Sequence, residues 1–96
     1  MFDLPVVTAT ERREYTRFRK YLVKNGFLMM QESVYTKLVP NDSAARWTVE
    51  NLKKNKPVEG LVQALMVTEK QFSKIECIIG SVQSDVLDSD ERIVFL

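Results

Sequence analysis

The chain has 96 residues, of which 45% are hydrophobic and 28% are charged, and its formal net charge is +1. This length and composition fit one ordinary globular domain. With no histidine and one cysteine, the sequence excludes an internal disulfide, a cysteine-cluster zinc site and the commonest general base. Without a membrane-span run or a signal-peptide pattern, we expect a cytoplasmic protein with no membrane partner.

Charge is distributed unevenly along the chain. Residues 1–56 hold eleven Lys and Arg against six Asp and Glu, whereas residues 57–96 hold three against seven. A basic front half favours a polyanionic partner. A domain this small buries a limited core, so oligomerisation is also expected.

The first segment, Met1 to Pro5, predicts the end of a strand that the proline stops. Because this strand begins so close to the first residue, we expect the biological start to lie upstream. Thr8 and Glu11 have capping-box spacing and predict a helix from there to Asn25, ended by Gly26 in the left-handed conformation. Thr10 is a competing N-cap.

This helix has two distinct faces when its residues are placed at about 100° each. Tyr15, Phe18 and Leu22 cluster on the apolar face. The basic residues form a stripe opposite, with two more on a flank: Arg13, Arg17, Lys20 and Lys24, then Arg12 and Arg19. Glu11 and Glu14 lie in the first turn, where we expect them to neutralise little of the stripe.

Exposed helix faces are often lysine-rich, so the basic stripe could be a plain solvated surface. Arginine at two of its four central positions favours phosphate contact instead, because the guanidinium fork matches phosphate oxygens. The strands carry no aromatic stacking signature. The stripe therefore predicts contact with a nucleic-acid backbone, without base readout.

The middle of the chain predicts two strands, a second helix and a longer strand. Residues 27–31 and 34–39 are rich in β-formers around a reversal at Glu32-Ser33, although one long bent strand also fits. Asn41 or Asp42 caps the second helix, and Trp47 lies among its apolar positions, where we expect it to belong to the core. Residues 61–67 are apolar except for Gln63, which predicts a central strand.

The last third predicts a helical turn over 69–74 and a strand over 75–79 in which Cys77 is buried. Residues 81–91 form an acidic linker, and the Asp85, Asp88 and Asp90 run lacks the glycine and glutamate of a calcium loop. An apolar strand closes the chain over 92–96.

The element order β-α-β-β-α-β predicts an α+β, ferredoxin-like domain over residues 1–80, with helices on one face of an antiparallel sheet. Residues 81–96 add the acidic linker and a further strand. This strand can pair with its own sheet edge or complete a dimer through Ile93, Val94 and Phe95.

Asp3 is the only acid at the carboxyl end of the first strand. Such an aspartate can simply accept backbone N–H bonds at the turn. In a two-fold dimer, two Asp3 side chains could instead share Mg²⁺ or Mn²⁺ with water and phosphate.

Several short motifs occur in a defined order: Phe2-Asp3-Leu4-Pro5, Glu11-Arg12-Arg13, Phe18-Arg19-Lys20, Gly26-Phe27, Gln31-Glu32-Ser33-Val34-Tyr35 and Val67-Thr68-Glu69-Lys70-Gln71-Phe72. Together they closely resemble the CRISPR-associated endoribonuclease 2 family, in particular members from type II systems. The resemblance implies a ferredoxin-like homodimer completed by C-terminal strands. It also implies a role in spacer acquisition, in which the dimer bridges two integrase dimers and holds protospacer duplex DNA. Some members are metal-dependent nucleases that use the aspartate corresponding to Asp3.

Two function classes follow. In the first, the chain is a DNA-binding bridge and the integration chemistry resides on the integrase. In the second, it is a Mg²⁺-dependent endonuclease for single-stranded RNA or double-stranded DNA, with paired Asp3 at the metal. A stand-alone, toxin-like ribonuclease is a third interpretation. The lack of histidine and of a second nearby acid favours the bridge.

Overall fold

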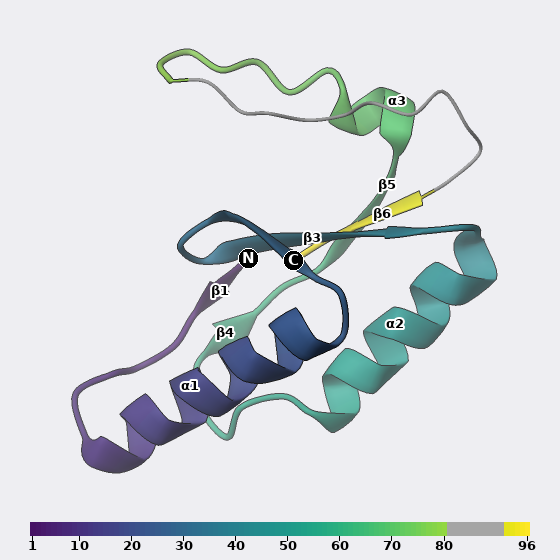
Figure 1. Ribbon diagram of the computed structural model, residues 1–96. Coiled ribbons are helices and arrows are strands. Elements are labelled where there is room, and N and C mark those ends of the chain that lie inside the picture. The colour runs from purple at the N-terminus through teal and green to yellow at the C-terminus, as the bar shows by residue number, and fades with distance from the viewer. Residues whose placement is uncertain (81–91) are drawn as a thin grey trace.

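The computed structural model describes residues 1–80 and 92–96. Within them it is an α+β fold of antiparallel sheets and three helices, in agreement with a ferredoxin-like arrangement. Helices α1 (Ala9–Lys24) and α2 (Asp42–Lys54) lie on one side of the strands, and the short α3 (Glu69–Phe72) lies on the other (Figure 1). No helix in this part of the chain is long and apolar enough to cross a membrane. The linker predicted over 81–91 lies outside the described residues.

The strands form a small sheet and a larger one. In the small sheet, β1 (Phe2–Asp3) pairs with β4 (Leu61–Val62). The larger sheet has the order β2-β3-β6-β5 and is antiparallel throughout. Its strands are β2 (Leu28–Gln31), β3 (Val34–Val39), β5 (Leu65–Thr68) and β6 (Arg92–Phe95).

Helix α1 begins and ends where the sequence predicts. The Thr8 Oγ1 atom accepts a hydrogen bond from Glu11 N at 3.1 Å, and Glu11 Oε1 accepts one from Thr8 N at 2.9 Å. Gly26 follows the helix with a φ of 86°, in the left-handed region that favours glycine. Both caps of the first helix are thus confirmed.

Helix α2 is capped by Asn41, whose side chain accepts a hydrogen bond from Ala44 N at 2.8 Å. Its buried residues are Ala45, Thr48 and Leu52. The placement of Trp47 among core positions is wrong, because its side chain is 66% exposed. A residue two positions after Ala45 points about 200° away from it, off the buried stripe.

The core lies between the larger sheet and the two long helices. Phe18 and Leu22 of α1 are fully buried there, together with Val94 and Leu96 from the C-terminal segment. Phe2 packs edge-on against Phe18, with ring centroids 5.5 Å apart. The apolar face of α1 is therefore held against the sheet, and its basic face is turned outward.

The strand predicted over 61–67 is divided, because Gln63 and Ala64 separate β4 from β5. Its central position in the sheet was also a wrong prediction, since β5 lies at the edge of the larger sheet. The central position belongs to β6, which pairs with β3 and β5.

The C-terminal strand was expected to pair at a sheet edge or with a second molecule, and β6 is instead internal to its own sheet. Val94 is fully buried and Ile93 is 8% exposed, although they point to opposite faces. Such two-sided burial is typical of a central strand. Exchange of β6 between two copies stays a prediction.

The strand predicted over 75–79 is absent from the structure, and Cys77 is exposed rather than buried. Ile78 and Ile79 are 87% and 94% exposed. Helix α3 leads the chain away from the sheet, so this segment pairs with no strand in the described part of the chain. An apolar, β-forming sequence does not become a strand without a neighbour.

Candidate nucleic-acid interface

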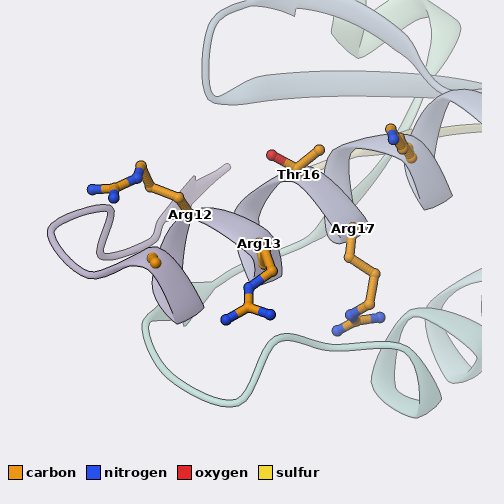
Figure 2. Close-up of a pocket in the computed structure, with 6 residues that line it drawn as sticks. Arg12, Arg13, Thr16 and Arg17 are labelled. Carbon is orange, nitrogen blue, oxygen red and sulfur yellow. The ribbon is translucent and has the colours of Figure 1, made fainter.

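The basic face of α1 borders an open groove of about 650 Å³. We call this the basic groove. Its lining residues all come from α1 and are mostly cationic: Ala9, Arg12, Arg13, Thr16, Arg17 and Lys20. In Figure 2, Arg13 and Arg17 project from the helix in similar directions, whereas Arg12 extends toward the segment that precedes it.

The groove follows directly from the periodicity of α1. Because Phe18 and Leu22 face the core, residues about half a turn away face solvent. Arg13, Arg17 and Lys20 are spaced four and three residues apart, so neighbouring side chains start about 5–6 Å from each other. Lys24 continues the same line one turn later.

Arg12 is engaged by the loop that leads into the helix. Its Nη1 atom donates hydrogen bonds to the carbonyl oxygens of Val7 at 2.7 Å and Val6 at 3.4 Å. Glu11 completes the loop by accepting from Val7 N at 3.1 Å. Arg12 therefore stabilises the start of the helix as well as contributing charge.

Arg17 connects α1 to the end of α2. Its Nη1 atom donates to Asn55 O at 3.3 Å, and its Nη2 atom donates to Lys56 O at 3.2 Å. The same Nη2 atom lies 3.0 Å from Glu14 Oε2. The guanidinium fork thus spans both helices, which a lysine could not reproduce.

Glu14 corrects the expectation that the first-turn acids leave the stripe alone. Its hydrogen bond and charge interaction with Arg17 lower the pKa of the Glu14 carboxyl. The charge of Arg17 is therefore partly neutralised, and its guanidinium group is bonded to residues of its own chain.

The remaining basic residues carry the available charge. Across residues 1–80 and 92–96, no side-chain hydrogen bond or ion pair joins another residue to Arg13, Arg19, Lys20 or Lys24. All four are exposed. Arg13, Lys20 and Lys24 lie along one line of the helix, at a spacing that can match successive anionic groups of an extended ligand, whereas Arg19 lies on the flank.

Sequence reasoning missed Thr16, which lies in the groove between the arginines. Its position, three residues after Arg13 and four before Lys20, could have indicated that it lies on the same face of the helix. A hydroxyl there can donate a hydrogen bond to a phosphate oxygen.

Asp3 lies at the end of β1, exposed and opposite Leu61 of β4. Gly60 permits this close pairing: its φ is 108°, and a Cβ atom there would lie 2.7 Å from Asp3 O. Asp3 does not line the basic groove. Within one chain, the predicted metal ligand and the predicted nucleic-acid-binding stripe are therefore separate.

A divalent metal would need more ligands than Asp3 provides. Among residues 1–80 and 92–96, no three Asp, Glu, Cys or His side chains are grouped so as to hold a metal ion. One exposed carboxylate does not fit Mg²⁺ or Mn²⁺ by itself, because these ions need several oxygen ligands. Within a single described chain, the residues therefore do not form the predicted metal site.

The sheet face turned away from α1 and α2 carries an apolar surface that we call the open face. Register places Leu28, Thr36, Phe95 and Leu65 in one row across the four strands. Opposed residues in adjacent strands share a face. Leu28 is 73% exposed and Leu65 is 56% exposed, whereas the Phe95 ring lies 6.2 Å from that of Phe72 in α3.

A second row of the open face joins Leu38, Ile93 and Val67. Leu38 is 43% exposed, whereas Ile93 is buried. Of the three residues expected to mediate a dimer, Val94 faces the helices and is fully buried in its own chain. The exposed leucines of the open face were not anticipated as contact residues.

Comparison with known proteins gives a consistent result. The family model described as "CRISPR associated protein Cas2" matches residues 1–75. A Treponema denticola protein named CRISPR-associated endoribonuclease Cas2 is 54% identical over 95 residues, covering 99% of this chain and 94% of its own length. Proteins of the same name from Streptococcus mutans strain NN2025 and Ligilactobacillus salivarius are 46% and 41% identical over 96 residues. Both alignments cover 100% of this chain, and they cover 90% and 95% of those relatives.

Proposed function

The chain belongs to the CRISPR-associated Cas2 family, and from this premise we propose that it is a DNA-binding subunit of spacer acquisition. In this proposal α1 binds the phosphate backbone of a protospacer duplex. The subunit is a homodimer that bridges two dimers of the CRISPR integrase. The integration chemistry resides on that partner.

The observation that carries the proposal is the set of cations on α1 that pair with no side chain in the part of the chain that the structure describes. Arg13, Lys20 and Lys24 lie along one line of an exposed helix face, and Arg19 lies on its flank. Arginine and lysine in such an array neutralise phosphates and release counterions from DNA. Contacts of this kind hold a duplex in place without selecting its sequence.

Arg17 supports the array indirectly. By binding the carbonyl oxygens of Asn55 and Lys56, it fixes α1 against the end of α2. A surface held rigid before binding loses less conformational entropy when the duplex docks.

The open face supports the homodimer. Leu28, Leu38 and Leu65 expose apolar surface on the side of the sheet that α1 and α2 leave uncovered. Two copies joined through this face would bury these leucines and carry their basic grooves on opposite outer sides. A duplex or integrase bound to each side would then be bridged by the dimer.

The direct test measures the binding of a short DNA duplex and the co-purification of the integrase. Reversing the charge at Arg13 and Lys20 (R13E/K20E) should weaken duplex binding on the order of 100-fold at low salt, because attraction becomes repulsion. The control K70E/K74E makes the same charge change at exposed positions near α3. Equal loss of binding in both variants, or in neither, would contradict the assignment to α1.

A second candidate function is metal-dependent cleavage of RNA or duplex DNA, because the relatives are named endoribonucleases. In this chain it would depend on Asp3 from both copies, since one carboxylate does not complete a Mg²⁺ site. Asp3→Asn should leave duplex binding and spacer integration unchanged and abolish any cleavage that Mg²⁺ or Mn²⁺ supports. Cleavage that survives in Asp3→Asn would exclude this role of Asp3.

A further inference from the structure

Trp47 is an aromatic residue that the fold leaves on the surface of α2. Its side chain is 66% exposed and lies off the buried stripe of this helix. Within residues 1–80 and 92–96, its indole ring has no hydrogen bond and no contact with another aromatic ring. The indole is therefore a flat apolar surface that is open to another planar group.

A row of residues on α2 leads from Trp47 to α1. Trp47, Asn51 and Asn55 follow one another at four-residue spacing, so they lie along one side of the helix. Asn51 Nδ2 donates to Trp47 O at 2.9 Å, and Asn55 Nδ2 donates to Asn51 O at 2.8 Å. Asn55 O in turn accepts a hydrogen bond of 3.3 Å from Arg17 of α1. The row that carries Trp47 thus ends at the contact between the two helices.

The other flank of α2 faces away from α1. Val49 and Lys53 line a hollow of about 450 Å³ together with Leu61 and Val62 of β4. At about 100° per residue, Val49 and Lys53 are turned about 160° and 120° around the helix from Trp47. Trp47 is therefore on the flank of α2 that faces α1.

The cations of α1 lie along this flank. The two helices run in opposite directions (Figure 1), so the residues that precede Asn55 in α2 run alongside those that follow Arg17 in α1. Lys24 follows Arg17 by seven residues, and Trp47 precedes Asn55 by eight. At 1.5 Å per residue, these separations are about 10 Å and about 12 Å. Trp47 and Lys24 are therefore at a similar level along the two helices.

The charges around the indole favour an anionic ligand. Lys20 and Lys24 are exposed on α1, and Lys54 is exposed near the end of α2. Glu50 is an acid on the outer side of α2, and its Oε1 atom lies 3.0 Å from Lys53 Nζ, so its charge is balanced. A nucleic-acid strand that is held by its phosphates on these lysines can place an unpaired base on the indole.

We propose that Trp47 is a stacking platform for an unpaired base of the nucleic acid that α1 binds through phosphate contacts. An aromatic ring stacks on any base, so the platform does not select sequence. A paired base is already stacked within its duplex, so the platform favours a nucleic acid with a single-stranded extension over a blunt duplex. The inference rests on the proposed function and deepens it, because it needs a nucleic acid on the basic face of α1.

The test uses the fluorescence of Trp47, the only tryptophan in the sequence. The probes are a short blunt duplex, the same duplex with a single-stranded thymidine extension, and the same duplex with an extension of abasic sugar-phosphate units. The thymidine extension should quench the emission and bind about tenfold more tightly than the abasic extension. Because the two extensions carry equal charge, this difference reports the bases alone. Equal quenching and equal affinity for the two extensions would overturn the proposal.

Two substitutions at Trp47 test the role of the ring. Trp47→Ala should weaken binding of the thymidine extension about tenfold and leave binding of the abasic extension unchanged. Trp47→Phe should retain most of the affinity, because a smaller ring still stacks. Both variants should remain folded, since the side chain lies outside the core, and circular dichroism verifies this.

The matched control is Val23→Ala, which shortens a side chain of α1 that is 60% exposed. This variant should bind all the probes like wild type. If Trp47→Ala and Val23→Ala lost affinity equally, or if neither lost any, the role of Trp47 would be excluded.

Failure of this inference can be separated from failure of the proposed function. If R13E/K20E weakens binding of every probe while the bases make no difference, only the stacking by Trp47 is contradicted. If R13E/K20E weakens binding of no probe, the proposed function and the inference fail together. If the emission of Trp47 responds to the integrase and to no nucleic acid, the ring is a protein contact and the stacking proposal is overturned.

Discussion

The basic face of α1 and the open face of the larger sheet lie on opposite sides of the same layer of strands (Figure 1). The first presents cations that form no ion pair within residues 1–80 and 92–96, among them Arg13 and Lys20. The second presents exposed leucines, among them Leu38 and Leu65. One surface thus suits a polyanion and the other suits a protein partner. Because the core separates them, each can be altered while the other is left intact.

The largest effect is expected at the open face. Leu38→Asp with Leu65→Asp should convert a dimer to a monomer by weakening association on the order of 1000-fold, since each leucine loses an apolar contact and each aspartate would be buried. Both side chains are substantially exposed in the single chain, so the fold should persist. Analytical ultracentrifugation measures the mass, and circular dichroism verifies the fold.

Val58→Asp is the matched control for this pair, because Val58 is 83% exposed in the loop that precedes β4. The control should remain dimeric. A dimer that survived both open-face substitutions would remove this surface as the interface.

The next effect concerns Arg17, which belongs to the basic groove and also to the contact between helices. Arg17→Ala should lower the free energy of unfolding by about 1–2 kcal/mol, because it removes hydrogen bonds to Asn55 and Lys56. Arg17→Lys should lose most of the same stability and keep most of the duplex affinity, since charge is retained and the fork is not.

Urea denaturation and duplex titration of these two variants separate the roles of Arg17. If Arg17→Lys retained full stability, the carbonyl contacts would be unimportant. If it lost duplex binding as severely as R13E/K20E, Arg17 would be a direct phosphate ligand rather than a positioning residue.

A smaller effect is the pH dependence of the Glu14–Arg17 pair. Arg17 holds the pKa of the Glu14 carboxyl below its ordinary value of 4.5, so the unfolded chain binds this proton more readily than the folded one. The stabilisation is therefore present above pH 4.5 and is lost as pH falls through the folded pKa. Wild type should exceed Glu14→Gln in denaturation midpoint at neutral pH, and the two should converge in acid. A difference that grew in acid would contradict this assignment.

Local sequence signals predicted α1 and its surface well. Thr8, Glu11 and Gly26 define both ends, and the spacing of Phe18 and Leu22 defines the buried face. These signals depend only on residues that are close together in the sequence, so the structure of the helix could be predicted without knowing the rest of the fold. The contacts of Arg17 could not be predicted from such local signals, because its carbonyl partners lie 38 and 39 residues away in the sequence.

The sheet was less predictable, because strand order depends on partners far apart in the chain. The prediction of a strand over residues 92–96 is confirmed, but its central position in the sheet could not be inferred from composition. Residues 75–79 have similar composition and form no strand, because the described chain gives them no neighbour. The prediction that Trp47 is a core residue was wrong for another reason. It relied on the apolar character of tryptophan, whereas the position lies off the buried stripe of α2.

The central claim is that α1 binds a duplex through phosphate contacts made by Arg13, Lys20 and Lys24. The most direct measurement is the salt dependence of duplex affinity for wild type and for the triple alanine variant R13A/K20A/K24A. Each phosphate contact contributes about 0.9 to the slope of log K against log salt, so the slope should decrease by about 2.7 for each α1 that contacts the duplex. An unchanged slope, with the variant folded, would contradict the claim.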